Sequence, residues 1–236
     1  MSAFILIHSP LVGPFTWALV AKEFEQRQIK VVVPSLTSNP GSDVPYWKQH
    51  AYAVARSTQT LPPDEAVVLV AHSGAGMLLP AIRQVMGRPI AGYIFVDAGI
   101  PQDGKGRLDR FEHEAAEQFR RSAIDGLLPT WTDADLAQVI PDDQTRARFV
   151  ADLKPLPLAV YEEPIPVFDG WPDAPCSFIA FRSDDEYVYA DSLRHVEQQR
   201  WLSAKMVGMH FHMLVDPVAV VDALLSVTRE MGLVVA

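Results

Sequence analysis

Short runs of aliphatic and β-branched residues alternate along this chain with segments whose apolar positions recur every three or four residues. The first pattern is typical of buried strands and the second of amphipathic helices, so their alternation predicts a mostly parallel, twisted sheet with helices on both faces. We expect strands at residues 4–9, 29–34, 66–72, 91–97, 177–181 and 205–208. We expect helices at residues 15–27, 46–59, 75–86, 192–200 and 217–231. The predicted fold class is therefore α/β.

The alternation breaks between residues 99 and 174. This stretch contains a charged helical pattern, RFEHEAAEQFRR, and a proline-dense one, LKPLPLAVYEEPIPVFDGWPDAP. We interpret residues 99–174 as a helical cap inserted into a core made of residues 1–98 and 175–236. An insertion between sheet strands lies over their carboxyl ends, which is where ligands bind in open α/β sheets.

Composition narrows the class of protein. The chain has 236 residues, 49% of them hydrophobic, which is enough for one substantial core. A net charge of −9 argues against binding to nucleic acid, so a small molecule is the expected partner. The opening residues, MSAFILIHSP, lack the basic region and cleavage site of a signal peptide, so we expect a cytoplasmic protein with no membrane segment. The single cysteine, Cys176, is interpreted as a core residue.

One serine follows a predicted strand at the start of a predicted helix. The segment VVLVAHSGAGMLLP (residues 67–80) surrounds Ser73 with the small residues Ala71, Ala75 and Gly76. A nucleophilic serine on a sharp strand-to-helix turn needs small neighbours, and the N–H of the next residue, Gly74, would face an oxyanion. The usual G-x-S-x-G pattern reads A-x-S-x-A here. The alternative interpretation is a serine that only caps a buried helix.

Four motifs together resemble the α/β-hydrolase family, and within it the small capped group that contains plant methylesterases and hydroxynitrile lyases. They are HSPLVGPFTW (residues 8–17), AHSGAG (residues 71–76), the D-x-x-V of residues 185–188, and GMHFHMLVDP (residues 208–217). The resemblance implies an α/β-hydrolase fold, a Ser-Asp-His order along the chain, and no cofactor.

The resemblance makes His210 the catalytic base. His210 and His212 could instead form an H-x-H metal site, but no third ligand has a suitable spacing, so we expect no metal. We interpret His212 as structural or pocket-lining. His8 and His72 are expected to be hydrogen-bonded to nearby backbone.

The acid that orients the histidine has three candidates. Asp185 occupies the position usual for the family, and Asp184 is its neighbour. Asp97 ends the predicted strand YIFVD and occupies an alternative acid position found in some relatives. Asp185 is the preferred prediction, because a carboxylate there could stabilise the imidazolium that forms in the reaction.

The second oxyanion donor departs from the family pattern. The resemblance assigns it to the backbone N–H of residue 10, which is Pro10 and has no N–H. Either the Leu11 N–H or the Ser9 hydroxyl completes the hole with Gly74, or Gly74 is the single donor.

These residues predict a serine hydrolase that cleaves carboxylic esters through an acyl-enzyme. The expected substrates are small to medium and apolar, in a pocket lined by Pro10, Phe111, Phe119, Trp131 and Trp171. Two alternatives remain open: a lyase in which Ser73 and His210 relay a proton, as in hydroxynitrile lyases, and a non-catalytic receptor for a small ligand on the same fold.

Overall fold

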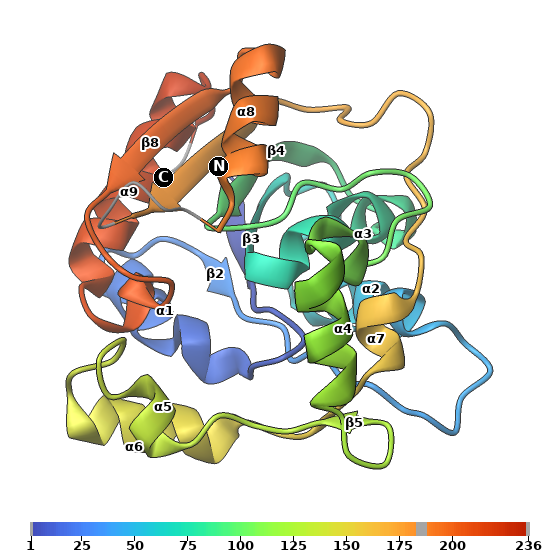
Figure 1. Cartoon of the computed structure of the whole chain (residues 1–236). Helices are drawn as coiled ribbons and strands as arrows, with labels where there is room; N and C mark the ends of the chain where they lie inside the picture. Colours follow the sequence, from blue (N-terminus) through green and yellow to red (C-terminus); the bar gives the residue numbers. More distant parts are fainter. Residues whose placement is uncertain (1, 183–187, 235–236) are drawn as a thin grey trace.

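The centre of the molecule is a parallel sheet with the strand order β2-β1-β3-β4-β7-β8, shown in the computed structural model of Figure 1. The structure describes residues 2–182 and 188–234. The strands are β1 (Ala3–Ile7), β2 (Val31–Val32), β3 (Val67–His72), β4 (Ile90–Val96), β7 (Cys176–Phe181) and β8 (Leu202–Met206). Such a sheet with helices on both faces confirms the predicted fold class.

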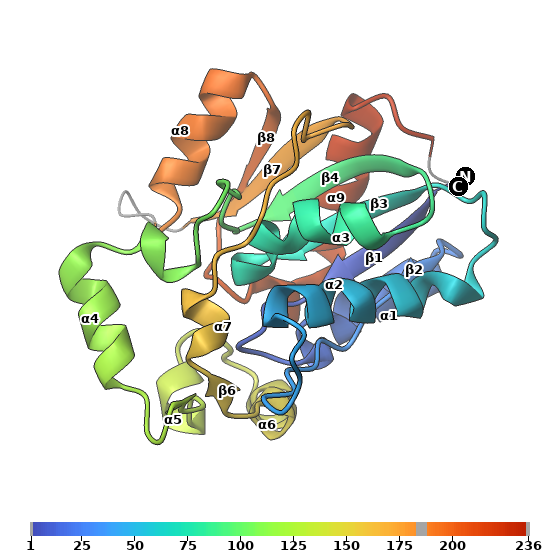
Figure 2. The same ribbon diagram turned by 90° about the vertical axis from the view of Figure 1, so that its right-hand side faces the viewer.

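Helices cover both faces of this sheet (Figure 2). One face packs against α2 (Tyr46–Ser57), α3 (Leu79–Val85) and α8 (Ala190–Gln199). The other face packs against α1 (Ala18–Gln26) and α9 (Pro217–Glu230). Within the described residues, no helix has the length and apolar character that crossing a membrane requires.

Side chains of the central strands point alternately into two hydrophobic clusters. In β3, Val67, Leu69 and Ala71 contribute to the cluster that contains α2 and α3. Val68 and Val70 contribute to the cluster that contains α1 and α9. Because both faces are buried, the strand is a continuous apolar run in the sequence, which is the signal that predicted it.

The edge strands differ more from the prediction than the central ones. Only Val31 and Val32 of the expected strand at residues 29–34 pair with β1. β8 begins at Leu202, three residues before the predicted strand. Ser203 and Lys205 of β8 are exposed and alternate with half-buried residues, so this edge strand lacks the apolar run that marks the others.

The segment between β4 and β7 contains short elements around a cluster of its own. They are η4 (Leu108–Arg110), α4 (His113–Arg121), β5 (Leu127–Leu128), α5 (Asp133–Leu136), α6 (Asp143–Asp152), β6 (Leu156–Pro157) and α7 (Ala159–Glu162). Leu108, Leu128 and Val160 form the centre of this cluster. Glu163 joins the segment to the main fold, because its carboxylate accepts hydrogen bonds from the first two N–H groups of α2, at 3.0 and 2.8 Å.

Candidate active site

Ser73 lies on a sharp turn between β3 and η3 (Ser73–Leu78). Its φ is 57°, a left-handed conformation that is unusual for a residue with a side chain. The carbonyl oxygen of Ser73 accepts a hydrogen bond from the Gly99 N–H at 3.1 Å. Gly76 is required for this approach, because a Cβ there would lie 2.2 Å from the Gly99 oxygen. The backbone of Ser73 therefore has the geometry expected of a nucleophile elbow.

His210 is paired with Asp97, which follows β4 on the strand next to that of Ser73. The His210 Nδ1 and Asp97 Oδ2 atoms are 2.6 Å apart. Asp97 is buried, and its other oxygen accepts a hydrogen bond from the Phe181 N–H at 3.0 Å. Asp97 also has a positive φ, 46°. The alternative acid candidate thus contacts the predicted base, whereas the preferred candidate Asp185 and its neighbour Asp184 lie outside the described residues.

The loop that carries His210 is held from behind by His72. The His72 Nε2–H donates to the His210 carbonyl oxygen at 2.9 Å, and the two imidazole rings are 4.4 Å apart. Burial lowers the pKa of His72 well below its ordinary value, so the ring is neutral. His8 contacts the Ser9 carbonyl at 2.8 Å. Both histidines are bonded to backbone, as predicted, and His212 packs against Phe181.

The Ser73 hydroxyl is hydrogen-bonded to the Tyr189 hydroxyl at 3.1 Å. Among the described residues no hydrogen bond joins Ser73 to His210, although both line one cavity. The Tyr189 ring stacks on His210 with a centroid separation of 5.8 Å, and burial raises the pKa of its hydroxyl, which stays protonated. Sequence reasoning missed Tyr189. Its available signal was a tyrosine directly after the D-x-x-V motif, where a side chain can reach the end of the neighbouring strand.

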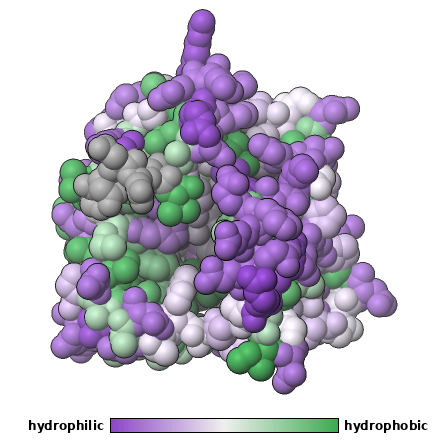
Figure 3. All heavy atoms as spheres, in the orientation of Figure 1, coloured by the Kyte–Doolittle hydropathy of each residue, from purple (hydrophilic) through white to green (hydrophobic). Residues whose placement is uncertain are grey.

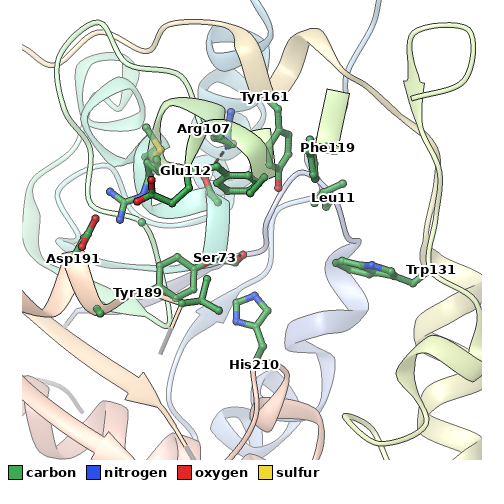
Figure 4. A pocket seen from close by; sticks show the side chains of 18 residues that line it. Leu11, Ser73, Arg107, Glu112, Phe119, Trp131, Tyr161, Tyr189, Asp191 and His210 are labelled. Atoms are coloured by element: carbon green, nitrogen blue, oxygen red, sulfur yellow. Dashed lines mark hydrogen bonds between the residues drawn. The ribbon is translucent and has the colours of Figure 1, made fainter. Parts of the chain in front are cut away.

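The cavity above Ser73 has a volume of about 580 Å³ (Figure 4). Tyr189 and Asp191 lie on one side of it, and Leu11, Phe119 and Trp131 on the other. The predicted pocket residues among its lining are Phe111, Phe119 and Trp131.

Two predicted pocket residues lie elsewhere. Trp171 packs against Tyr93 and Phe95 in the main core, and Pro10 is buried in the loop after β1 without lining the cavity. The prediction for Trp171 fails because its position in the fold brings its ring against these two residues of β4, where a large aromatic ring packs favourably.

On the outside, polar side chains cover α4, beside a hollow with hydrophobic borders (Figure 3).

Potential oxyanion donors surround Gly74. Ser9 is buried, and its Oγ has no hydrogen-bond partner in the described part of the chain. That Oγ would lie 3.2 Å from a Cβ placed on Gly74, so the two residues are in contact. Leu11 lines the cavity, and no partner of its N–H is found among the described residues. Ser9 thus places a hydroxyl beside Gly74, and Leu11 lines the same cavity as Gly74.

Comparison with known proteins agrees with this geometry. The model of the "Alpha/beta hydrolase family" matches residues 4–223. The chain therefore belongs to the α/β-hydrolase family, as the resemblance of its motifs predicts.

Within that family, the chain is similar to methylesterase 1 from Arabidopsis thaliana, with 28% identity over 104 residues. This match covers 42% of the chain and 40% of the relative. The chain thus spans less than half the length of the curated relatives it matches.

Two solved structures share the fold across nearly the whole chain. An extracellular α/β-hydrolase from a Paenibacillus species has a TM-score of 0.78 at 16% identity, covering 96% of this chain and 99% of that one. Tomato methylketone synthase I, complexed with 2-tridecanone, has a TM-score of 0.75 at 16% identity, covering 98% of each chain.

Proposed function

We propose that this protein is a serine hydrolase that cleaves carboxylic esters through an acyl-enzyme. The observation that carries the proposal is the meeting of Ser73, on an elbow-like turn, with the His210–Asp97 pair in one cavity. Membership of the α/β-hydrolase family and similarity to methylesterases support the choice of an ester bond.

In the proposed reaction, the Ser73 oxygen attacks the ester carbonyl carbon while His210 Nε2 accepts the serine proton. Asp97 holds Nδ1 as the donor, which leaves Nε2 free to act as the base, and its charge stabilises the imidazolium. His210 then returns the proton to the leaving alcohol. Water hydrolyses the acyl-enzyme by the same steps in reverse.

The Ser73 side chain must turn from Tyr189 toward His210 before it attacks, since its hydroxyl is bonded to Tyr189 in this structure. The oxyanion would then accept from the Gly74 N–H and from the Leu11 N–H or the Ser9 hydroxyl. The second donor, from Leu11 or Ser9, compensates for the N–H that Pro10 lacks.

The segment at residues 99–174 is the proposed cap, and it sets the substrate class. Its residues Phe111, Phe119 and Trp131 line the cavity together with Leu11 and Met77 of the core. Apolar and aromatic walls favour esters with small to medium apolar groups.

Ester hydrolysis that depends on Ser73 is the direct test. We expect the wild-type chain to hydrolyse p-nitrophenyl acetate or butyrate, and Ser73→Ala and His210→Ala each to lose nearly all turnover, by about 10⁵-fold or more. A fluorophosphonate probe should add one adduct mass to the wild type and none to Ser73→Ala. Full turnover by Ser73→Ala would remove Ser73 from the mechanism.

The bond between Ser73 and Tyr189 also favours a second candidate, a lyase in which serine and histidine relay a proton without forming an acyl-enzyme. Such an enzyme would cleave a cyanohydrin such as mandelonitrile, leave simple esters intact, and depend on the same two residues. Loss of both activities, with Ser73 unlabelled, would indicate a ligand receptor instead.

A further inference from the structure

Arg107 is a buried cation beside the nucleophile turn, contributed by the segment between β4 and β7. It is 3% exposed. Its Nε–H donates to the Gly74 carbonyl oxygen at 3.0 Å (Figure 4), and its Nη1–H donates to the Val160 carbonyl oxygen at 2.8 Å. Its Nη2 has no hydrogen-bond partner among the described residues. The side chain therefore connects α7 to the residue after the nucleophile.

Arg107 completes a set of contacts that fixes both peptide groups of Gly74. The peptide between Ser73 and Gly74 is held at its oxygen by the Gly99 N–H, and the next peptide is held by Arg107. The Cδ and Nε atoms of Arg107 also lie against the Gly74 backbone, 3.3 Å from where a Cβ would be. The Gly74 N–H belongs to the first of these peptides, and Arg107 holds the second, so Arg107 helps to aim the N–H by restricting rotation of the Gly74 backbone between them.

Arg107 forms no ion pair in the described part of the chain, although its guanidinium carbon lies 5.8 Å from the centre of the Tyr161 ring and the charge of Glu163 partly compensates its own. Burial lowers the pKa of its guanidinium to about 10. Because this value is still well above neutral pH, the side chain remains charged there. Burying a cation without a paired carboxylate costs stability, because its hydration is lost. The largely buried Arg146 gives the contrast, since its guanidinium forms ion pairs with Asp133 and Asp143 at 2.9 and 2.7 Å.

We propose that Arg107 is a positioning residue, which aims the Gly74 N–H and places a positive charge that has no ion-pair partner among the described residues beside the oxyanion site. A positive charge in a site of low dielectric stabilises negative charge as it develops on the substrate. The inference rests on the proposed serine chemistry.

Three variants test it. Arg107→Met removes the charge and both hydrogen bonds, and Arg107→Lys keeps the charge but not the two-carbonyl geometry. Arg146→Met is the matched control, because it removes a buried arginine whose carbonyl bonds lie away from the cavity. Each is compared by kcat and KM for p-nitrophenyl butyrate, by inhibition with phenylboronic acid, and by deuterium exchange of a peptide covering residues 72–80.

We expect Arg107→Met to lower kcat by about 10- to 100-fold with little change in KM, a smaller effect than the 10²–10³ that loss of a donor causes. Phenylboronic acid forms an anionic tetrahedral adduct with serine, so its inhibition constant should rise by a similar factor. The kcat and the inhibition constant of Arg107→Lys should lie between those of Arg107→Met and the wild type. If Arg107→Met does not fold, Arg107→Lys is measured in its place. Exchange at residues 72–80 should rise in the Arg107 variants and stay unchanged in Arg146→Met.

Unchanged kcat and boronic acid affinity in Arg107→Met would overturn the proposal, and so would an equal loss in Arg146→Met. Failure of the proposed function gives a different result, since the wild type itself would then show no hydrolysis that depends on Ser73. In that case the exchange measurement decides, and unchanged exchange at residues 72–80 overturns the positioning role.

Discussion

Ser73 and Asp97 follow neighbouring strands of the sheet, and hydrogen bonds from other backbone segments hold both of them. The opposite wall of the same cavity comes from the segment at residues 99–174, where α4 buries a single residue, Ala116. The sheet end thus has geometry imposed by a fully buried core, whereas the segment is held by a smaller cluster of its own and by side-chain hydrogen bonds such as those of Glu163 and Arg107. The difference supports the proposal that the sheet positions the reacting groups and that the segment determines substrate preference.

In this comparison, the largest effect is expected from altering Asp97 at the sheet end. Asp97→Asn keeps the shape of the side chain but favours the wrong histidine tautomer, so kcat for p-nitrophenyl butyrate should fall by up to about 10⁴-fold. Asp185→Asn is the matched comparison, and steady-state kinetics of the two variants identify the acid. A greater loss in Asp185→Asn would return the role to the position preferred from the sequence.

The segment wall should respond differently. Trp131 lines the cavity and packs edge-on against Phe211. Trp131→Ala should raise KM for a bulky ester such as p-nitrophenyl octanoate by about tenfold or more, because a buried apolar contact of about 1.5–3 kcal/mol is lost. kcat should change less.

Trp171→Ala provides the control for this prediction, since Trp171 packs against Tyr93 and Phe95 in the core. It should lower the free energy of unfolding by about 3 kcal/mol and leave KM unchanged. A KM effect as large as that of Trp131→Ala would show that both aromatic residues shape the cavity.

The free energy of unfolding, measured across pH, should show how much stability the buried histidines near the sheet end cost at low pH. Burial lowers the pKa of His8 to about 4 and that of His50 to about 3, from 6.5 in the unfolded chain. As pH falls below 6.5, the unfolded chain binds protons that the folded chain does not, so stability falls by about 1.4 kcal/mol per pH unit for each histidine. His50→Gln should flatten this slope by about one proton in urea unfolding between pH 6 and 4.5. An unchanged slope would mean that His50 takes up its proton in the folded state.

The smallest effect concerns Tyr189, at the border between the two regions. Its hydroxyl is hydrogen-bonded to the Ser73 hydroxyl, a bond that must break if Ser73 turns toward His210, and such a bond contributes about 0.5–1.5 kcal/mol. Tyr189→Phe should therefore speed fluorophosphonate labelling of Ser73 by about two- to tenfold. Slower labelling would show that the hydroxyl stabilises the transition state.

The same division separates what the sequence could predict from what it could not. The apolar run before Ser73 and the small residues around it predict the strand, the turn and the position of the serine. Gly76, two positions beyond Gly74, permits the close approach to Gly99. These features are local, so a single sequence contains them.

Features that depend on distant residues were harder to predict. The contact of Asp97 with His210 joins residues separated by 113 positions, and the motif resemblance favoured a different aspartate. Arg107 resembles any surface arginine in a polar segment, and its burial follows from packing against Gly74 and Val160. Trp131 and Trp171 have equal apolar character, and tertiary structure alone separates the cavity wall from the core.

The Ser2 N–H donates to the Val234 carbonyl oxygen at 3.3 Å, at the end of the sheet away from the cavity, where the N and C labels lie together (Figure 2). An anchor attached to either of these neighbouring segments would leave the cavity facing solution. The arrangement makes this end of the sheet suitable for immobilising the protein on a surface.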